Sequence, residues 1–224
     1  MKRVFFCLVI LVLLLGAAAA DERPPMIALT FDDGPSEYTQ QMLDLLAEND
    51  CKATFFMIAQ YVEMMPEMPQ IVIDSGCEVG THTLFHRPLN ELSEGKIYTD
   101  LLKCIEQIEE LTGEHIRWLR PPWGKVSMDT YAACRRLNLL IVKWSLDSSD
   151  WESRNTEKIV QKILDNVSDG DVILCHDTYP ETLEAMRIVL PELKERGYEL
   201  VTVSELFSYF PGELKSTTFY TQLN

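Results

Sequence analysis

The sequence has few positive charges, and this shortage excludes two classes of partner. Lysine and arginine total 20, against 35 aspartate and glutamate residues, which gives a formal net charge of −15. Loss of Lys2 and Arg3 with an N-terminal leader would change that charge from −15 to −17. Such a surface repels nucleic acid and anionic membranes. The composition therefore predicts no nucleic-acid partner, and it is neutral about an uncharged sugar polymer.

The cysteines lack the pattern of a disulfide framework or a zinc ribbon. Outside the N-terminal apolar segment their number is odd, their spacing is irregular and no two form a CxxC pair. They are Cys51, Cys77, Cys104, Cys134 and Cys175. We expect buried thiols that pack as small apolar residues. A single bridge between Cys51 and Cys77 is the alternative, because each directly precedes a predicted strand.

Beyond the N-terminus, the sequence has no apolar run long enough to cross a bilayer. Residues 1–20 combine a basic start, an apolar run from Val4 to Leu15 and small residues from Ala17 to Ala20. This layout is typical of a secretory signal peptide, since the run is short for a membrane span. An uncleaved anchor is the alternative. We expect a secreted or cell-envelope protein with no stable membrane insertion after cleavage.

Internal repeats, low-complexity tracts and linkers are also missing, so the rest of the chain suits one domain. Short β-rich runs alternate with segments whose apolar residues are spaced by three and four. The clearest helix has Ser93 near its start, Gly113 just past its end and apolar residues at Ile97, Leu101, Ile105, Ile108 and Leu111. The predicted strands are Met26–Thr30, Ala53–Ile58, Cys77–Thr81, Ile116–Arg120, Leu140–Ser145, Asp171–Cys175 and Glu199–Val203.

This alternation of strands and helices predicts an α/β fold with a parallel sheet. About seven such units in one chain favour a barrel or a strongly curled sheet, and a doubly wound open sheet is the alternative. We assign residues 21–210 to this single domain. Residues 211–224 have the composition of a polar, loosely held tail.

Polar side chains follow five of the predicted strands. They are Asp32 and Asp33 after the first, His82 and His86 after the third, Arg120 at the end of the fourth, Asp150 after the fifth and His176 after the sixth. In parallel α/β folds the C-terminal ends of the strands share one face, where active sites are built. We therefore expect the two adjacent acids to face histidines and an arginine.

The segment THTLFH indicates a metal site. A helical turn would place His82 and His86, four residues apart, on one side. A lone pair of this kind is more often structural, but Asp33 would complete a set that leaves room for water and substrate. Two imidazoles and a carboxylate suit zinc and also admit cobalt, manganese, nickel or iron. We assign His115 to a surface loop.

The remaining polar groups suit acid–base chemistry. Asp32 can activate an attacking water as a general base, although an ordinary turn and a phosphoacceptor aspartate are alternatives for the DDG sequence. Arg120 can orient Asp32 and hold it ionised. A carboxylate bonded to His176 would favour imidazolium, a competent general acid. Trp123 and Trp151 are either core aromatics or walls of a sugar site.

The segments TFDDGP, HTxxH, RPPWG, DxxDW and LCH occur together in one order. In this the chain resembles the polysaccharide deacetylase family, the NodB-homology domain of carbohydrate esterase family 4, from about Ile27 to Leu206. The resemblance implies a distorted (β/α)7 barrel and a metal-dependent deacetylase. The N-acetylated glycan would be peptidoglycan, at N-acetylglucosamine or N-acetylmuramic acid, or a chitooligosaccharide. An O-acetyl esterase on acetylated xylan and a catalytically silent glycan-binding module are the alternatives.

The resemblance also implies roles for single residues. Asp33, His82 and His86 would hold the metal, usually zinc, with Asp32 as base, His176 as acid, Arg120 as partner of Asp32 and Asp150 as partner of His176. Leu174 would line the pocket for the acetyl methyl group, and the backbone amide of Trp123 would help to hold the oxyanion. The chain departs from the family pattern at Trp123, where tyrosine or phenylalanine is frequent, and at Phe85, where a small hydroxyl residue is frequent.

Overall fold

The computed structural model describes residues 23–223. The predicted signal peptide, residues 1–20, lies outside the described residues. Among the helices that are described, none is long and apolar enough to cross a membrane.

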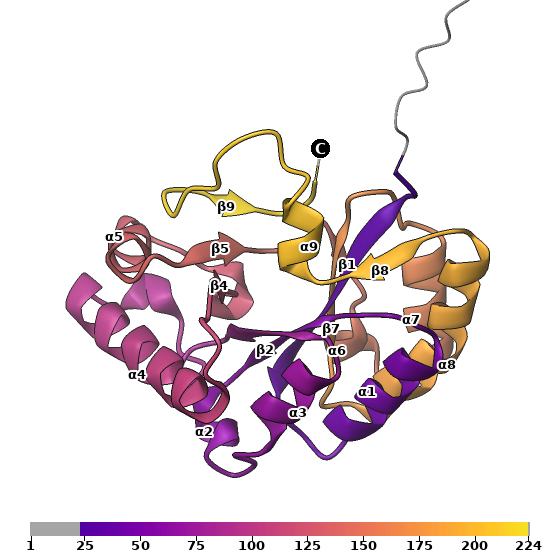
Figure 1. The fold of residues 1–224 in the computed structure, drawn as a ribbon, viewed down its shortest axis with the longest axis horizontal. Coiled ribbons are helices and arrows are strands. Elements are labelled where there is room, and N and C mark those ends of the chain that lie inside the picture. The colour runs from indigo at the N-terminus through magenta and orange to yellow at the C-terminus, as the bar shows by residue number, and fades with distance from the viewer. Residues whose placement is uncertain (1–22, 224) are drawn as a thin grey trace, which may run out of the picture.

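A curled parallel sheet forms the centre of the molecule (Figure 1). Its strands in the described chain are β1 (Met26–Gly34), β2 (Thr54–Met57), β3 (Glu78–Thr81), β4 (Trp118–Leu119), β5 (Leu140–Val142), β6 (Leu146–Asp147), β7 (Val172–His176), β8 (Glu199–Val201) and β9 (Phe219–Tyr220). They are arranged in the order β6-β7-β1-β2-β3-β4-β5-β9, and β8 pairs with the start of β1. The predicted α/β barrel fold is confirmed, and all seven predicted strands are present. The short strands β6 and β9 were not predicted.

Helices surround the sheet, with α4 and α5 on one flank and α1, α7 and α8 on the other (Figure 1). The helices are α1 (Thr39–Glu48), α2 (Ala59–Val62), α3 (Met68–Asp74), α4 (Glu94–Thr112), α5 (Met128–Leu137), α6 (Asp150–Ser153), α7 (Thr156–Leu164), α8 (Pro180–Glu195) and α9 (Val203–Phe207). The limits predicted for α4 are confirmed, since Ser93 precedes it and Gly113 ends it at φ +70°. A glycine is favoured there because it adopts a left-handed conformation without strain.

Alternation along β1 divides the core and positions the acids. Successive side chains of a strand point to opposite faces. Ile27, Leu29 and Phe31 join the cluster that packs under the helices, whereas Met26 and Ala28 join a second cluster. Continuing this second face, Thr30 and Asp32 point into the barrel. The barrel interior is therefore apolar where β1 begins and polar where β1 ends.

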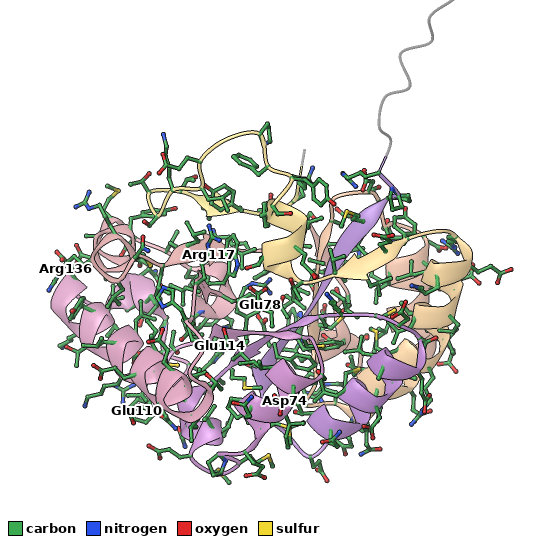
Figure 2. All side chains as sticks on the ribbon, in the orientation of Figure 1. Asp74, Glu78, Glu110, Glu114, Arg117 and Arg136 are labelled. Carbon is green, nitrogen blue, oxygen red and sulfur yellow. The ribbon has the colours of Figure 1, made fainter. Side chains whose placement is uncertain are left out.

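A partly buried carboxylate closes the N-terminal end of the barrel. Glu78 begins β3, and Arg117 directly precedes β4; both are labelled in Figure 2. Glu78 accepts hydrogen bonds from the Thr54 hydroxyl at 2.8 Å and from the Ser204 backbone N–H at 3.1 Å. The Ser204 hydroxyl also donates to Glu78 and accepts a bond from the Trp118 indole at 2.8 Å. This network ties β2, β3, β4 and α9 together at the end opposite the acids of β1.

The C-terminal segment completes the curl of the sheet. Strand β9 pairs with β5, Gln222 forms an antiparallel bridge with Asp171, and the Leu223 N–H donates to the Gly170 carbonyl at 2.8 Å. Gly170 has φ +87°, and a Cβ there would lie 2.1 Å from the Leu223 carbonyl oxygen. The expectation of a loosely held tail is thus corrected for residues 219–223. The buried side chains of Tyr220 and Leu223 hold this short segment against the core.

The five cysteines are buried and free, as predicted. No bridge joins Cys51 to Cys77. Burial raises the pKa of the Cys51 thiol to about 11 and that of Cys104 to about 12, so both stay protonated at neutral pH.

Replacing Tyr220 by alanine tests whether the C-terminal segment is part of the folding unit. The Tyr220 ring packs against Trp118, Phe207 and Phe210. Its loss should lower the free energy of unfolding by about 2–4 kcal/mol in urea denaturation. Phe219→Ala, which truncates the 41 % exposed neighbour, is the control and should cost less than about 1 kcal/mol. Equal small losses in both variants would mean that the segment contributes little to folding.

Candidate active site

A bulge at the end of β1 brings both acids to the mouth of the barrel. In register, Asp32 lies beside His176 of β7 and Phe56 of β2, and the pairing with β2 shifts between Asp32 and Gly34. Asp33 has φ +71°, an unusual conformation for a residue other than glycine. As a result, the His82 Nε2 atom lies 3.8 Å from Asp32 Oδ2 and 3.4 Å from Asp33 Oδ1. Neighbouring strand residues normally point apart, so the bulge makes this arrangement possible.

The two histidines of THTLFH come together, but not through a helical turn. The segment between β3 and the short helix at Leu89–Glu91 is irregular, and Thr83 and His86 have φ values of +74° and +53°. The expected helical placement is therefore wrong. The imidazole centres still lie 4.9 Å apart, because this loop folds both rings toward Asp33.

Asp33, His82 and His86 form a candidate metal site. The Asp33 Oδ1 atom lies 3.4 Å from the Nε2 atoms of both His82 and His86. Tetrahedral zinc with bonds of about 2.0–2.1 Å separates its ligands by about 3.3 Å, which fits these distances. Asp33 Oδ1 is also buried without a hydrogen-bond partner in the described chain. A bound cation would satisfy this oxygen, so the residues present fit a metal ion.

The protonation states at this cluster suit metal binding. The His82 Nδ1–H donates to the Arg120 carbonyl at 2.7 Å, which leaves the Nε2 lone pair directed at Asp33. Burial, together with the charge of His82, lowers the pKa of His86 below its usual value. Burial raises the pKa of the Asp33 carboxyl, but the facing histidines outweigh it and lower the value to about 2. The cluster thus offers a charged carboxylate at Asp33 and, at His86, an imidazole whose neutral form is favoured.

Arg120 holds the other acid of β1. Its side chain is completely buried, and Nη1 donates to Asp32 Oδ1 at 3.1 Å. The remaining nitrogens donate to the carbonyls of Val142 and Lys143 and to the Thr30 hydroxyl, at 3.0–3.2 Å. Such complete pairing is required for a buried charge. Asp32 is thereby fixed beside the metal cluster, with Oδ2 on the His82 side.

Asp150 makes His176 a strong base. The His176 Nδ1 lies 2.8 Å from Asp150 Oδ1, and Asp150 Oδ2 accepts bonds from the His176 N–H at 2.7 Å and the Thr182 hydroxyl at 2.8 Å. Burial lowers the pKa of His176, but the Asp150 carboxylate outweighs this and raises it to about 9. His176 therefore carries a proton at neutral pH, and its Nε2 faces Asp33 at 4.0 Å.

A pocket of about 330 Å³ opens over these groups. Leu174 is buried on its floor, whereas Trp123 and Trp151 are 56 % and 50 % exposed on its walls. Both tryptophans are therefore groove residues and not core aromatics. The structure adds Trp144, Asp147 and Tyr179 to the lining. A larger hollow of about 650 Å³ near β8 has a mixed lining that includes Lys52 and Glu205, which pair with each other.

Asp177 is a buried acid whose role the sequence did not indicate. It is completely buried beyond His176, its carboxylate accepts a bond from the Thr39 hydroxyl, and its backbone carbonyl accepts one from Ser36. A Cβ at Gly34 would lie 2.6 Å from its Oδ1 atom. Asp177 thus joins the end of β7 to the turn after β1, and glycine allows the close approach. Burial raises the pKa of Asp177 to about 7.

Asp150→Asn tests the cause of the raised pKa of His176. Removal of the charge should lower the pKa of His176 from about 9 by about one to two units. The shift can be followed by NMR titration of the imidazole C–H signals. His115, which is exposed and bonded to Glu109, is an internal control. The substitution should leave the titration curve of its signal the same as in wild type. An unchanged His176 titration would exclude Asp150 as the cause.

Asp177→Asn tests whether this acid is protonated in the folded protein. Its pKa rises from 3.8 to about 7 on folding, so its stabilising effect is full below pH 3.8 and is lost as the pH rises through 7. The difference in unfolding free energy, wild type minus variant, should fall by up to about 1.4 kcal/mol per pH unit between pH 4 and 7. Denaturation curves at several pH values measure it. A difference that is constant with pH would contradict the assignment.

Known proteins share this fold and sequence. The family model for polysaccharide deacetylase matches residues 19–142. A peptidoglycan-N-acetylglucosamine deacetylase of Bacillus cereus is 37 % identical over 190 residues, covering 82 % of this chain and 89 % of the relative. The Listeria monocytogenes deacetylase PgdA is 36 % identical over 182 residues. The match covers 81 % of this chain but only 38 % of the length of PgdA.

A solved structure agrees with the sequence matches. The peptidoglycan deacetylase PdaC of Bacillus subtilis superposes with a TM-score of 0.79 at 33 % identity, over 83 % of this chain and 91 % of that one. The full-length PdaC protein is named a peptidoglycan-N-acetylmuramic acid deacetylase. It is 34 % identical to this chain over 187 residues, a match that covers 83 % of this chain and 39 % of PdaC. From its sequence and its curled parallel barrel, the chain belongs to the polysaccharide deacetylase family.

Proposed function

We propose that this protein is a metal-dependent deacetylase that hydrolyses N-acetyl groups of a glycan and releases acetate. The observation that carries the proposal is the position of Asp33 Oδ1, buried without a partner and 3.4 Å from both His82 and His86 Nε2 atoms. Asp32 pairs in register with His176, whose Nε2 atom lies 4.0 Å from Asp33 Oδ2, and Asp32 Oδ2 lies 3.8 Å from His82 Nε2. A candidate base and a candidate acid thus both lie next to one candidate metal site.

Asp33, His82 and His86 would hold the metal, and zinc suits two imidazoles and one carboxylate best. When bound, the metal supplies a Lewis acid that polarises the acetyl carbonyl. The three residues lie at or just after the C-terminal ends of β1 and β3, so the sheet brings them together. Cobalt, manganese, nickel and iron are the other candidates for this ligand set.

Asp32 and His176 would carry the protons. Asp32, oriented by Arg120, takes a proton from the attacking water. His176, kept protonated by Asp150, then gives its proton to the sugar nitrogen as the carbon–nitrogen bond breaks. The products are acetate and a free amine on the sugar. Because the base must be ionised and the acid protonated, activity should follow a bell-shaped pH profile.

The remaining lining would position the substrate. Leu174 offers an apolar contact for the acetyl methyl group on the pocket floor, and the backbone amide of Trp123 would donate to the oxyanion of the tetrahedral intermediate. Trp123 has φ +53° and its ring lies 4.4 Å from His86, so this turn is held against the metal cluster. The exposed ring of Trp151 would stack on a sugar.

The substrate class is inferred from relatives and chemistry together. The relatives act on N-acetylglucosamine or on N-acetylmuramic acid of peptidoglycan, as their names state. We propose a glycan of the cell wall, reached after export with residues 1–20 as a signal peptide. The proposed domain follows this segment and includes the C-terminal strand that pairs with β5. Presence of both Asp32 and His176 argues against a silent glycan-binding module.

Acetate release tests the proposal directly. The protein should release acetate from chitooligosaccharides or peptidoglycan, lose activity with a chelator and regain it with zinc. Asp32→Asn should lower kcat/KM at least about 100-fold, because the general base is lost. Acetylxylan is the comparison substrate, and faster release from it would favour an O-acetyl esterase. If the zinc-loaded protein releases no acetate from any of these, a silent glycan-binding module becomes the better interpretation.

A further inference from the structure

An arginine lies beside the groove on the His176 side. The guanidinium carbon of Arg154 lies 3.2 Å from the centre of the Tyr179 ring, and Tyr179 lines the pocket. The Tyr179 ring lies 5.7 Å from the His176 ring. These two distances add to 8.9 Å, which is the most that can separate the guanidinium carbon from the centre of the His176 ring. A glycan whose acetyl group lies at His176 is therefore within reach of Arg154.

Two contacts position the exposed side chain of Arg154, the Tyr179 ring and the Trp151 carbonyl. Its backbone has φ +43° where α6 ends, and Asn155 begins α7 by accepting a bond from the Lys158 N–H at 2.9 Å. Its Nε donates to the Trp151 carbonyl at 3.2 Å. A positive φ at a residue other than glycine, as at Arg154, costs about 1–3 kcal/mol and persists only where the surrounding structure imposes it. The bond to Trp151 and the contact with Tyr179 reduce the ordering that ligand binding would require of this side chain.

The terminal nitrogens of Arg154 have no acceptor within residues 23–223. Glu152 and Glu157 are close in sequence, yet neither forms an ion pair with it in that part of the chain. By contrast, five other arginines form ion pairs with acids: Arg23, Arg120, Arg136, Arg187 and Arg196. In a chain with 35 acids and 20 bases, Arg154 lies on an aromatic ring and keeps two donors free.

We propose that Arg154 binds a carboxylate of the substrate, so that the site prefers an acidic N-acetylated glycan to a neutral one. This inference rests on the proposed deacetylase function. A guanidinium offers two parallel N–H donors that match the two oxygens of a carboxylate, and stacking on a ring leaves that edge accessible. The carboxylate can come from the lactyl group of muramic acid or from a stem peptide.

The charge of the whole chain makes a local cation necessary for such a substrate. With a net charge of −15, the surface repels an acidic glycan, and salt screens this repulsion only beyond about 10 Å. Arg154 offsets it at the groove. A second cation, Lys125, lies 5.9 Å from the centre of the Trp123 ring on the His86 side. Lys125 is a matched control because it also lies over a groove aromatic.

The experiment compares glycans that differ in one charge. The zinc-loaded protein is assayed on a peptidoglycan disaccharide with a free lactyl carboxylate, on the same disaccharide with that group as a primary amide, and on the disaccharide with its stem peptide. The variants are Arg154→Gln, Arg154→Lys and Lys125→Gln. Chitooligosaccharides, which carry no carboxylate, test the deacetylase function by itself.

Wild type should favour an acidic disaccharide over the amide by about five- to tenfold in kcat/KM, mainly through KM. Arg154→Gln should reduce that ratio to about one, Arg154→Lys should restore part of it, and Lys125→Gln should retain it. A preference confined to the stem-peptide substrate would place the carboxylate on the peptide. Equal rates for acid and amide in wild type, or an unchanged ratio in Arg154→Gln, would overturn the proposal.

Binding separates this inference from the deacetylase proposal. If no substrate releases acetate, quenching of tryptophan fluorescence by the acid and amide disaccharides measures the same preference, since Trp123, Trp144 and Trp151 line the pocket. In wild type the dissociation constants of the acid and amide disaccharides should differ by about five- to tenfold. In Arg154→Gln the two constants should be about equal. Equal dissociation constants in wild type would reject the role of Arg154 even where deacetylation fails.

Discussion

The buried guanidinium of Arg120 is the interaction on which the mouth of the barrel depends. A completely buried cation is tolerated only if every donor finds an acceptor. Arg120 reaches Asp32 on β1 and the carbonyls that end β5, while its own carbonyl accepts the His82 Nδ1–H. One residue at the end of β4 thus orients an acid, connects three strands and selects the tautomer of His82, a candidate metal ligand. The ring of Phe56 covers its guanidinium at 4.4 Å.

Unusual backbone conformations concentrate around this guanidinium and the metal cluster. Asp33, Thr83, His86 and Trp123 all have positive φ. Each costs about 1–3 kcal/mol, and such residues persist where a functional arrangement is imposed by the rest of the fold. The long apolar strand β1 and the helices packed on it supply that stability. The site is therefore built on loops that are strained locally but anchored at strand ends.

Sequence patterns predicted which polar groups lie at the mouth of the barrel, but they did not predict the local backbone conformations of these residues. Parallel strands deliver their C-terminal residues to one face, so Asp32, His82 and His176 could be placed together from their positions alone. The expected helical turn failed at His86, because positive φ values at non-glycine residues leave no sequence signal. The strand at Phe219–Tyr220 is too short for a period-two pattern, so its closure of the barrel could not be predicted. The burial of Asp177 likewise depends on contacts between distant segments.

The charge balance of the pocket explains why a cation belongs between its histidines. Asp32 is paired with Arg120, and Asp150 is paired with His176. Asp33 is also ionised, and its buried Oδ1 has imidazole nitrogens at 3.4 Å but no bonded donor in the described chain. The facing histidines lower the pKa of this carboxyl to about 2, and a divalent ion held there would add a further positive charge beside it. We therefore expect a bound metal ion to stabilise the folded protein, because it would bind a ligand set that only the folded chain brings together.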